Sequence, residues 1–259
     1  MKKVLSIAGS DPSGGAGIQA DIKTITAHKM YAMTAVTALT VQNTTGVFGV
    51  FEAPAKFVAK EIGAVMEDIF PDAVKIGMVS DEGIVRTSAD RLAFWEAKNI
   101  VCDPVMVATS GGRLMSEGAA EALSEALIPL AAVITPNIPE AEALSGFPVR
   151  NRKDMLRAAE RIAKRYRGWI LVKGGHLPDT ADDLLFREGE AVWFEGDKVD
   201  NPNTHGTGCT LSSAIACGLA DGKTVEESVR AAKAYLTGAL RDGLDLGRGS
   251  GPLNHCYAL

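Results

Sequence analysis

The stretch KVLSIAGSDPSGGAGIQADIKT (residues 3–24) shows how this chain is built. Residues 3–9 are mostly apolar, and they end at a polar, glycine-rich turn that is followed by a helical pattern over 15–28. An apolar run without strict alternation is typical of a strand whose two faces are both covered by helices. Because the run is only a few residues long, it is too short for a signal peptide or a membrane span. The N-terminus therefore predicts a buried first strand.

The same succession of a short apolar run and an amphipathic stretch continues along the chain. After residue 180, DLLF and AVWFEG flank the turn REGE and predict an antiparallel hairpin. The sequence thus predicts one domain over residues 1–259, a three-layer α/β/α sandwich whose mostly parallel central sheet carries an antiparallel edge hairpin. The other expected strands are 34–43, 73–79, 99–106, 131–137 and 169–175, and the other expected helices are 55–69, 81–97, 117–127, 139–145, 152–166, 207–220 and 224–241.

The charge and the cysteine spacing of the chain argue against several classes of binding partner. The chain has 259 residues, and its net charge of −5 gives no basic field that would collect nucleic acid or an anionic membrane. The cysteines form no CxxC pair and no metal-like spacing with the histidines, so neither a zinc site nor a disulfide framework is indicated. We therefore expect a cytoplasmic protein whose ligands are small molecules.

The ends of the expected strands are polar or rich in glycine. In an open parallel sheet, ligands bind outside the carboxyl ends of the strands. We therefore expect one ligand site there. The segments that would line it are AGSDPSGG, TVQNTTG, KIGMVS, DPVM, TPNIPE and KGGH.

The segment HGTGCT (205–210) is a candidate anion site. Its glycine turn opens the helix expected at 207–220, so backbone N–H groups and the positive end of the helix would face the same point. The pattern also fits an ordinary tight turn. It is not a P-loop, because GxxxxGK[ST] is absent, and GSDPSGG near the N-terminus lacks the GxGxxG of a dinucleotide fold.

Cys209 is the reactive group beside this turn. A helix N-terminus and bound cations lower the pKa of a thiol, so Cys209 is a candidate proton acceptor. The alternative is a small side chain packed under the turn. Cys102, Cys217 and Cys256 lie in apolar patterns or near the terminus, and we assign them no chemistry.

Several blocks together resemble the bacterial hydroxymethylpyrimidine/phosphomethylpyrimidine kinases, which belong to the ribokinase-like superfamily. The resemblance extends over essentially the whole chain. It implies the ribokinase-like form of the sandwich, ATP with Mg²⁺ as phosphoryl donor, and phosphorylation of 4-amino-5-hydroxymethyl-2-methylpyrimidine and then of its monophosphate. The blocks are AGSDPSGGAGIQADIKT (8–24), ALTVQNTTGV (38–47), KIGM (75–78), DPVM (103–106), TPNIPEAEAL (135–144), VKGGH (172–176) and THGTGCTLSSAIA (204–216).

The resemblance also implies roles for the phosphate side of the site. The anion hole for the transferred phosphoryl group would be Gly206, Thr207 and Gly208, followed by Cys209 where most of the superfamily has aspartate. Glu140 would organise Mg²⁺, with Asp103 as a second candidate, because hard oxygen ligands suit this ion. The predicted nucleotide-binding residues are Lys173, Asn137 and His205.

Each of these residues has a simpler interpretation. Asn137 and Glu140 are also suited to cap the helix at 139–145. A lysine that ends a strand, as Lys173 does, is often only a solvated charge. His205 is equally suited to pack the turn as to reach a phosphate.

The acceptor pocket is predicted from the same resemblance and from side-chain chemistry. The amide of Gln42 offers both a donor and an acceptor to an aminopyrimidine, while apolar side chains form walls. By resemblance, Gly9, Asp21 and Thr40 complete the pocket. The predicted apolar walls are Met78, Val105 and Val107.

Two other functions are compatible with the sequence. Some pyridoxal/pyridoxine kinases of vitamin B6 salvage resemble this family, and their pocket residues would distinguish them. A non-catalytic nucleotide-binding module on the same fold is the other alternative. By resemblance we expect a homodimer, and because the sequence ends at GPLNHCYAL we expect no appended domain.

Overall fold

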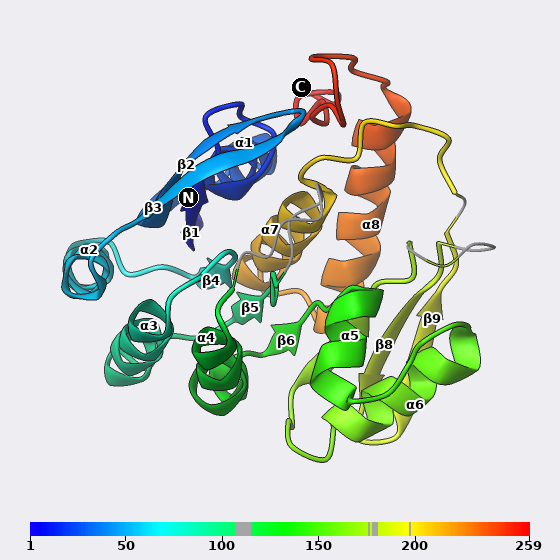
Figure 1. Ribbon diagram of the computed structural model, residues 1–259, viewed down its shortest axis with the longest axis horizontal. Coiled ribbons are helices and arrows are strands. Elements are labelled where there is room, and N and C mark those ends of the chain that lie inside the picture. The colour runs from blue at the N-terminus through cyan, green and yellow to red at the C-terminus, as the bar shows by residue number, and fades with distance from the viewer. Residues whose placement is uncertain (107–114, 176, 178–180, 197) are drawn as a thin grey trace.

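The computed structural model describes residues 1–106, 115–175, 177, 181–196 and 198–259. In this part of the chain, nine strands form one sheet in the order β3-β2-β1-β4-β5-β6-β7-β8-β9. Helices cover both faces of the sheet (Figure 1), which confirms the predicted three-layer sandwich. The strands are β1 Lys3–Ser10, β2 Tyr31–Asn43, β3 Gly46–Glu52, β4 Ala73–Ile76, β5 Ile100–Cys102, β6 Val133–Ile134, β7 Trp169–Val172, β8 Asp183–Arg187 and β9 Glu190–Phe194.

The centre of the sheet is parallel. Strand β1 lies between β2 and β4, and β4 to β7 continue the parallel order. Successive β1 side chains enter opposite cores, since Val4 packs against one face and Leu5 and Ile7 against the other. All three are fully buried. The unbroken apolar character of residues 3–9 therefore follows from a strand covered on both sides.

Both edges of the sheet are antiparallel. The predicted hairpin is present as β8 and β9, but β2 and β3 form a second one at the opposite edge. Sequence analysis missed β3, because its outer face lacks the polar residues that mark an exposed strand face. Phe48 and Phe51 on this strand are 66% and 68% exposed.

The helices divide between the two faces. Helices α1, α7 and α8 contribute to one core, and helices α2 to α6 contribute to the other. Helix α7 is buried from Thr210 to Ala220. This burial explains its small and apolar composition. The bounds are α1 Gly17–Ala27, α2 Ala55–Asp68, α3 Glu82–Phe94, α4 Glu117–Ala122 with a π-helical turn Leu123–Leu127 and a 3-10 turn Ile128–Leu130, α5 Ile138–Ser145, α6 Arg152–Ile162, α7 Thr207–Ala220 and α8 Val225–Arg241.

The fold brings strand ends and helix beginnings to one edge. Helix α1 follows β1, α5 follows β6, and α7 packs against α1 and behind β4 and β5 (Figure 1). Within the described residues, no helix combines the length and the apolar character needed to cross a membrane.

Candidate active site

The anion turn begins helix α7. Gly206 is its N-cap residue, with φ 85° in the left-handed region that favours glycine. A Cβ atom at Gly206 would collide with the carbonyl oxygen of Gly15, so the turn and the N-terminal loop are in direct backbone contact. At Gly208, a Cβ atom would lie 3.1 Å from Asp103 Oδ2 and 3.4 Å from Lys173 Nζ. The first turn of α7 therefore opens toward the ends of β5 and β7.

The Cys209 thiol lies at this opening and is half-buried. Burial raises its pKa, and the positive charge of Lys75 and a hydrogen bond from the Gly17 N–H offset this only in part. In the protein without bound cations, desolvation therefore outweighs the favourable charges. The lowering of the thiol pKa by bound cations stays a prediction.

A buried ion pair lies beneath the site. Lys75 Nζ is 2.9 and 2.8 Å from the two carboxylate oxygens of Asp21, and both side chains are 0% exposed. Asp21 also accepts hydrogen bonds from Ser6 Oγ at 2.5 Å and Ser213 Oγ at 2.8 Å. With all its neighbours inside the protein, Asp21 does not line a pocket surface, contrary to the prediction. Its role here is to neutralise Lys75.

A second charged group joins the ends of β5, β6 and β7. Lys173 Nζ donates to Asp103 Oδ1 at 2.7 Å, and Thr135 Oγ1 donates to the same oxygen at 2.9 Å. Asp103 is 3% exposed, so this lysine is paired rather than merely solvated. The pair lies under Gly208, where a phosphoryl group held by the turn would be close to the ammonium group.

Glu140 belongs to this group and also caps α5. Its carboxylate accepts from the Asn137 N–H at 2.8 Å, and Asn137 Oδ1 accepts from the Glu140 N–H at 2.9 Å. The simpler capping interpretation is therefore present for both residues. Burial raises the pKa of Glu140 to about 7; Lys173 opposes this and the negative Asp103 adds to it.

The donor set at this point suits a cation that keeps part of its water shell. Among the described residues, no group of three or more potential metal ligands is present. Asp103 and Glu140 are two neighbouring carboxylates, and Glu140 is held in an environment that disfavours its own charge. Mg²⁺ commonly binds one or two carboxylates together with water and phosphate oxygens, so these two residues fit that ion.

Apart from Asp21, the residues predicted to line the acceptor pocket lie on β1 and β2 and just after β4 and β5. A Cβ atom at Gly9 would lie 3.3 Å from Met78 Cε, so these residues are in contact range. On β2, residues 38, 40 and 42 turn inward while 39, 41 and 43 are exposed. This alternation brings Thr40 and Gln42 to one face. Val105 lies three residues after the end of β5, and Val107 lies outside the described residues.

The structure places the His205 imidazole elsewhere than predicted. It points into the N-terminal loop rather than toward the phosphate side, with Nε2 2.8 Å from Asp11 Oδ2 and 3.4 Å from Gln42 Nε2. Burial would raise the pKa of Asp11, but hydrogen bonds from His205, Ser13 and Ala16 lower it to about 2. Asp11 is therefore a charged anchor for His205 at neutral pH.

Sequence analysis assigned no role to Lys75 or Asp11. Lys75 gave a signal, because a lysine inside the apolar run AVKIGMV must find a buried anion if the strand is covered on both faces. Asp11 gave none beyond its place in a glycine-rich turn, where an aspartate usually binds local backbone N–H groups.

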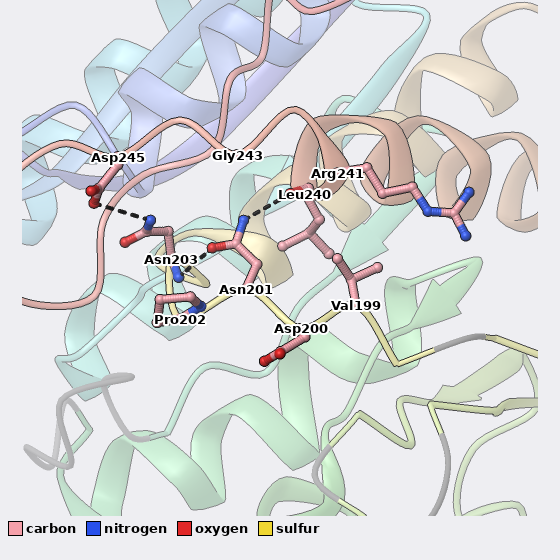
Figure 2. A pocket seen from close by; sticks show the side chains of 9 residues that line it. All are labelled: Val199, Asp200, Asn201, Pro202, Asn203, Leu240, Arg241, Gly243 and Asp245. Carbon is pink, nitrogen blue, oxygen red and sulfur yellow. Dashed lines mark hydrogen bonds between the residues drawn. The ribbon is translucent and has the colours of Figure 1, made fainter.

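A pocket of about 410 Å³ lies next to the chain that leads into the anion turn. Figure 2 shows it between the loop before α7 and the end of α8. Asn201 Nδ2 donates to the Leu240 carbonyl at 2.7 Å and so ties the two walls together. The pocket is lined by Val199, Asp200, Asn201, Pro202, Asn203, Leu240, Arg241, Gly243 and Asp245.

A family profile and a similar protein carry the same kinase description. The sequence profile described as phosphomethylpyrimidine kinase matches residues 11–254. The chain is 46% identical over 256 residues to the hydroxymethylpyrimidine/phosphomethylpyrimidine kinase of Streptomyces coelicolor, covering 99% of this chain and 95% of that one.

Two kinds of enzyme of known structure, a phosphomethylpyrimidine kinase and a pyridoxal kinase, have a fold similar to that of this chain. The phosphomethylpyrimidine kinase of Clostridium difficile is 45% identical, with a TM-score of 0.83 over 92% of this chain and 98% of that one. The pyridoxal kinase of Staphylococcus aureus in complex with AMP-PCP and pyridoxal is 35% identical, with a TM-score of 0.91 over 100% of this chain and 94% of that one.

Proposed function

We infer that this chain, which belongs to the phosphomethylpyrimidine kinase family, is a kinase of thiamine biosynthesis that phosphorylates 4-amino-5-hydroxymethyl-2-methylpyrimidine and then its monophosphate. The single observation that carries the proposal is the joint position of the anion turn, Cys209 and the inward face of β2 at one edge of the sheet. An acceptor alcohol and a phosphoryl donor can meet there. The sequence identity to named kinases over the whole chain supports the substrate.

We propose that the donor is ATP, since the structure of a pyridoxal kinase similar to this chain contains AMP-PCP. The backbone N–H groups of Gly206, Thr207 and Gly208 would bind the transferred phosphoryl group, and Lys173 would neutralise its charge from the end of β7. Glu140 and Asp103 would hold Mg²⁺. That ion would supply further charge neutralisation when bound. The pocket beside residues 199–203 offers space for another part of the nucleotide.

Cys209 is the proposed proton acceptor for the attacking hydroxyl group. Its sulfur lies at the start of α7, where the Gly17 N–H already contacts it. Burial raises the pKa of the thiol, and only its thiolate fraction, which grows with pH, accepts the proton. Phosphoryl transfer depends mainly on positioning and charge neutralisation, so a small fraction suffices for turnover.

Pyridoxal phosphorylation is the second candidate, and a specific finding favours it. The superposition on the pyridoxal kinase gives a TM-score of 0.91, against 0.83 for the pyrimidine kinase. Sequence identity points the other way, at 35% against 45%. Because pocket side chains rather than backbone position select the substrate, identity carries more weight here.

The test is ATP consumption by the wild type and by Cys209→Ala, each with hydroxymethylpyrimidine, its monophosphate or pyridoxal. The matched control is Cys256→Ala, which removes an exposed thiol to which no chemistry is assigned. We expect wild type and control to consume ATP with both pyrimidines, and Cys209→Ala to lose most of kcat while its KM changes little. Faster turnover of pyridoxal would establish the second candidate, and full activity of Cys209→Ala would exclude the thiol as proton acceptor.

We also propose a cytoplasmic homodimer built from one kinase domain per chain. The free state of all four cysteines supports the location. The continuous sheet supports one domain. The exposed apolar face of the β2–β3 hairpin, 56% at Leu39 and 68% at Phe51, supports self-association. Analytical ultracentrifugation of the wild type and Phe51→Glu checks this, because the substitution should yield monomers.

A further inference from the structure

His205 is the point where the phosphate side and the acceptor side of the site meet. In sequence it directly precedes Gly206 of the anion turn. Its backbone N–H donates to the Gly251 carbonyl at 3.1 Å, and its ring lies against Gly15, where a Cβ atom would collide with it. Its Nε2 atom faces both Asp11 and Gln42. Backbone and side chain of His205 are thus both held.

The ring proton of His205 is assigned by Asp11. The Asp11 carboxylate accepts from the Ser13, Gly15 and Ala16 N–H groups, and it has no proton of its own to give. At 2.8 Å from Oδ2, Nε2 must therefore carry the hydrogen. A nitrogen that carries hydrogen has no lone pair in the ring plane, so it cannot accept from Gln42.

This assignment decides which way the Gln42 amide faces. With Nε2 of Gln42 at 3.4 Å from Nε2 of His205, two N–H groups would oppose each other. The two ends of an amide have nearly the same shape, and the hydrogen-bond network selects between them. Turned by 180°, the amide oxygen faces the His205 N–H and shares it with Asp11, and the amide nitrogen takes the place of Oε1, 3.2 Å from Thr40 Oγ1.

Thr40 completes the selection. Its hydroxyl proton is donated to the Ser10 carbonyl at 2.9 Å, so the oxygen has lone pairs free to accept from the turned amide. Every donor in the chain from Asp11 to Ser10 then faces an acceptor. The amide oxygen lies on the His205 side and the amide nitrogen on the Thr40 side.

We propose that the Asp11–His205 pair is a positioning device that fixes the Gln42 amide for one orientation of the acceptor substrate, an inference that rests on the proposed pyrimidine site. The amide offers a donor on its Thr40 side and an acceptor on its His205 side. An aminopyrimidine edge has the matching pattern, a ring nitrogen that accepts beside an exocyclic amino group that donates. The ring nitrogen thus faces the Thr40 side, and the amino group faces the His205 side.

The experiment is a double-mutant cycle between His205 and Gln42. For each variant we would measure kcat, the KM of the acceptor alcohol, the KM of ATP and the thermal midpoint of unfolding. His205→Phe keeps a ring against Gly15 but removes the donor, whereas His205→Gln returns an N–H at a similar reach. The cycle partner is Gln42→Ala. The matched control is His255→Phe, because His255 is also a buried histidine bonded to α7, at Thr210 Oγ1, 2.9 Å away. Asp11→Asn is a second route, because it weakens the acceptor that holds the ring proton.

We expect His205→Phe to raise the acceptor KM about tenfold, with less than about a twofold change in the KM of ATP, because a Gln42 amide that is no longer fixed loses about one hydrogen bond to the acceptor. His205→Gln should restore most of the affinity, Asp11→Asn should raise the acceptor KM, and His255→Phe should leave it unchanged. In the Gln42→Ala background, His205→Phe should have little further effect.

The proposal is overturned if His205→Phe acts as strongly without Gln42 as with it, if His205→Gln is no better than His205→Phe, or if Asp11→Asn leaves the acceptor KM unchanged. A purely structural role would lower the thermal midpoint of all His205 variants without this ranking. The cycle is run on whichever alcohol the wild type phosphorylates, so a failure of the pyrimidine assignment remains separate from a failure of the positioning role.

Discussion

The buried pair of Lys75 and Asp21 gives the sharpest prediction for stability. Both side chains are fully buried, and two serine hydroxyls complete the shell of the carboxylate. Lys75→Met leaves a carboxylate without its cation, and Asp21→Asn leaves an ammonium group without its anion. Removing one partner of a buried pair costs about 3–5 kcal/mol, because the remaining charge is not compensated.

The expected shift in melting temperature follows from chain length. Unfolding entropy is about 2.1 cal/mol/K per residue, so for 259 residues a loss of about 4 kcal/mol lowers the midpoint by roughly 7 °C. The two single variants should each show this loss in urea unfolding at pH 7.5, followed by circular dichroism. The double variant removes both charges, so its loss should not exceed that of either single variant.

Additive losses in the double variant would refute this reasoning, since they would mean that the two side chains stabilise the fold independently. The matched control is Arg86→Met, which removes a cation from an exposed pair with Glu82. Because solvent screens such pairs, we expect little change there. If Asp21→Asn instead kept full stability and raised only the acceptor KM, the pocket-lining role first predicted for Asp21 would be restored.

Two further predictions concern the turn. Because burial raises the pKa of the Cys209 thiol, kcat/KM should still increase with pH beyond about pH 8.5, the ordinary pKa of a thiol. This increase should be absent in Cys209→Ala, and a plateau of the wild-type kcat/KM from pH 7 upward would exclude the thiolate as proton acceptor. Gly206→Ala should lower kcat at least about tenfold and reduce stability, because φ is 85° and the new Cβ would collide with Gly15. The matched control is Gly222→Ala, where φ is 84° but the space around the residue is open. This control bears only the backbone strain of about 1–3 kcal/mol and should keep its kcat.

The sheet and the location of the site could be predicted because they depend on patterns that the chain repeats. A run such as residues 3–9 is apolar on both faces only where helices cover both faces, and the polar ends of successive parallel strands must meet at one edge. The glycines of HGTGCT likewise require a turn at a helix start. The strand β3 could not be found in this way, because its exposed phenylalanines, Phe48 and Phe51, and the register shift beside them remove the alternation of polar and apolar residues.

The individual partners of charged side chains could not be predicted, because they depend on distances between segments far apart in sequence. Asp21 is 54 residues from Lys75, and His205 is 194 from Asp11. Asp21 and His205 were predicted to face ligands, and the structure gives each of them a charged partner within the protein. The same residue types fit a ligand or a buried counter-ion equally well, and only burial separates the two. A fully buried carboxylate that accepts four hydrogen bonds from three protein groups is already satisfied, so it supports the site without touching the substrate.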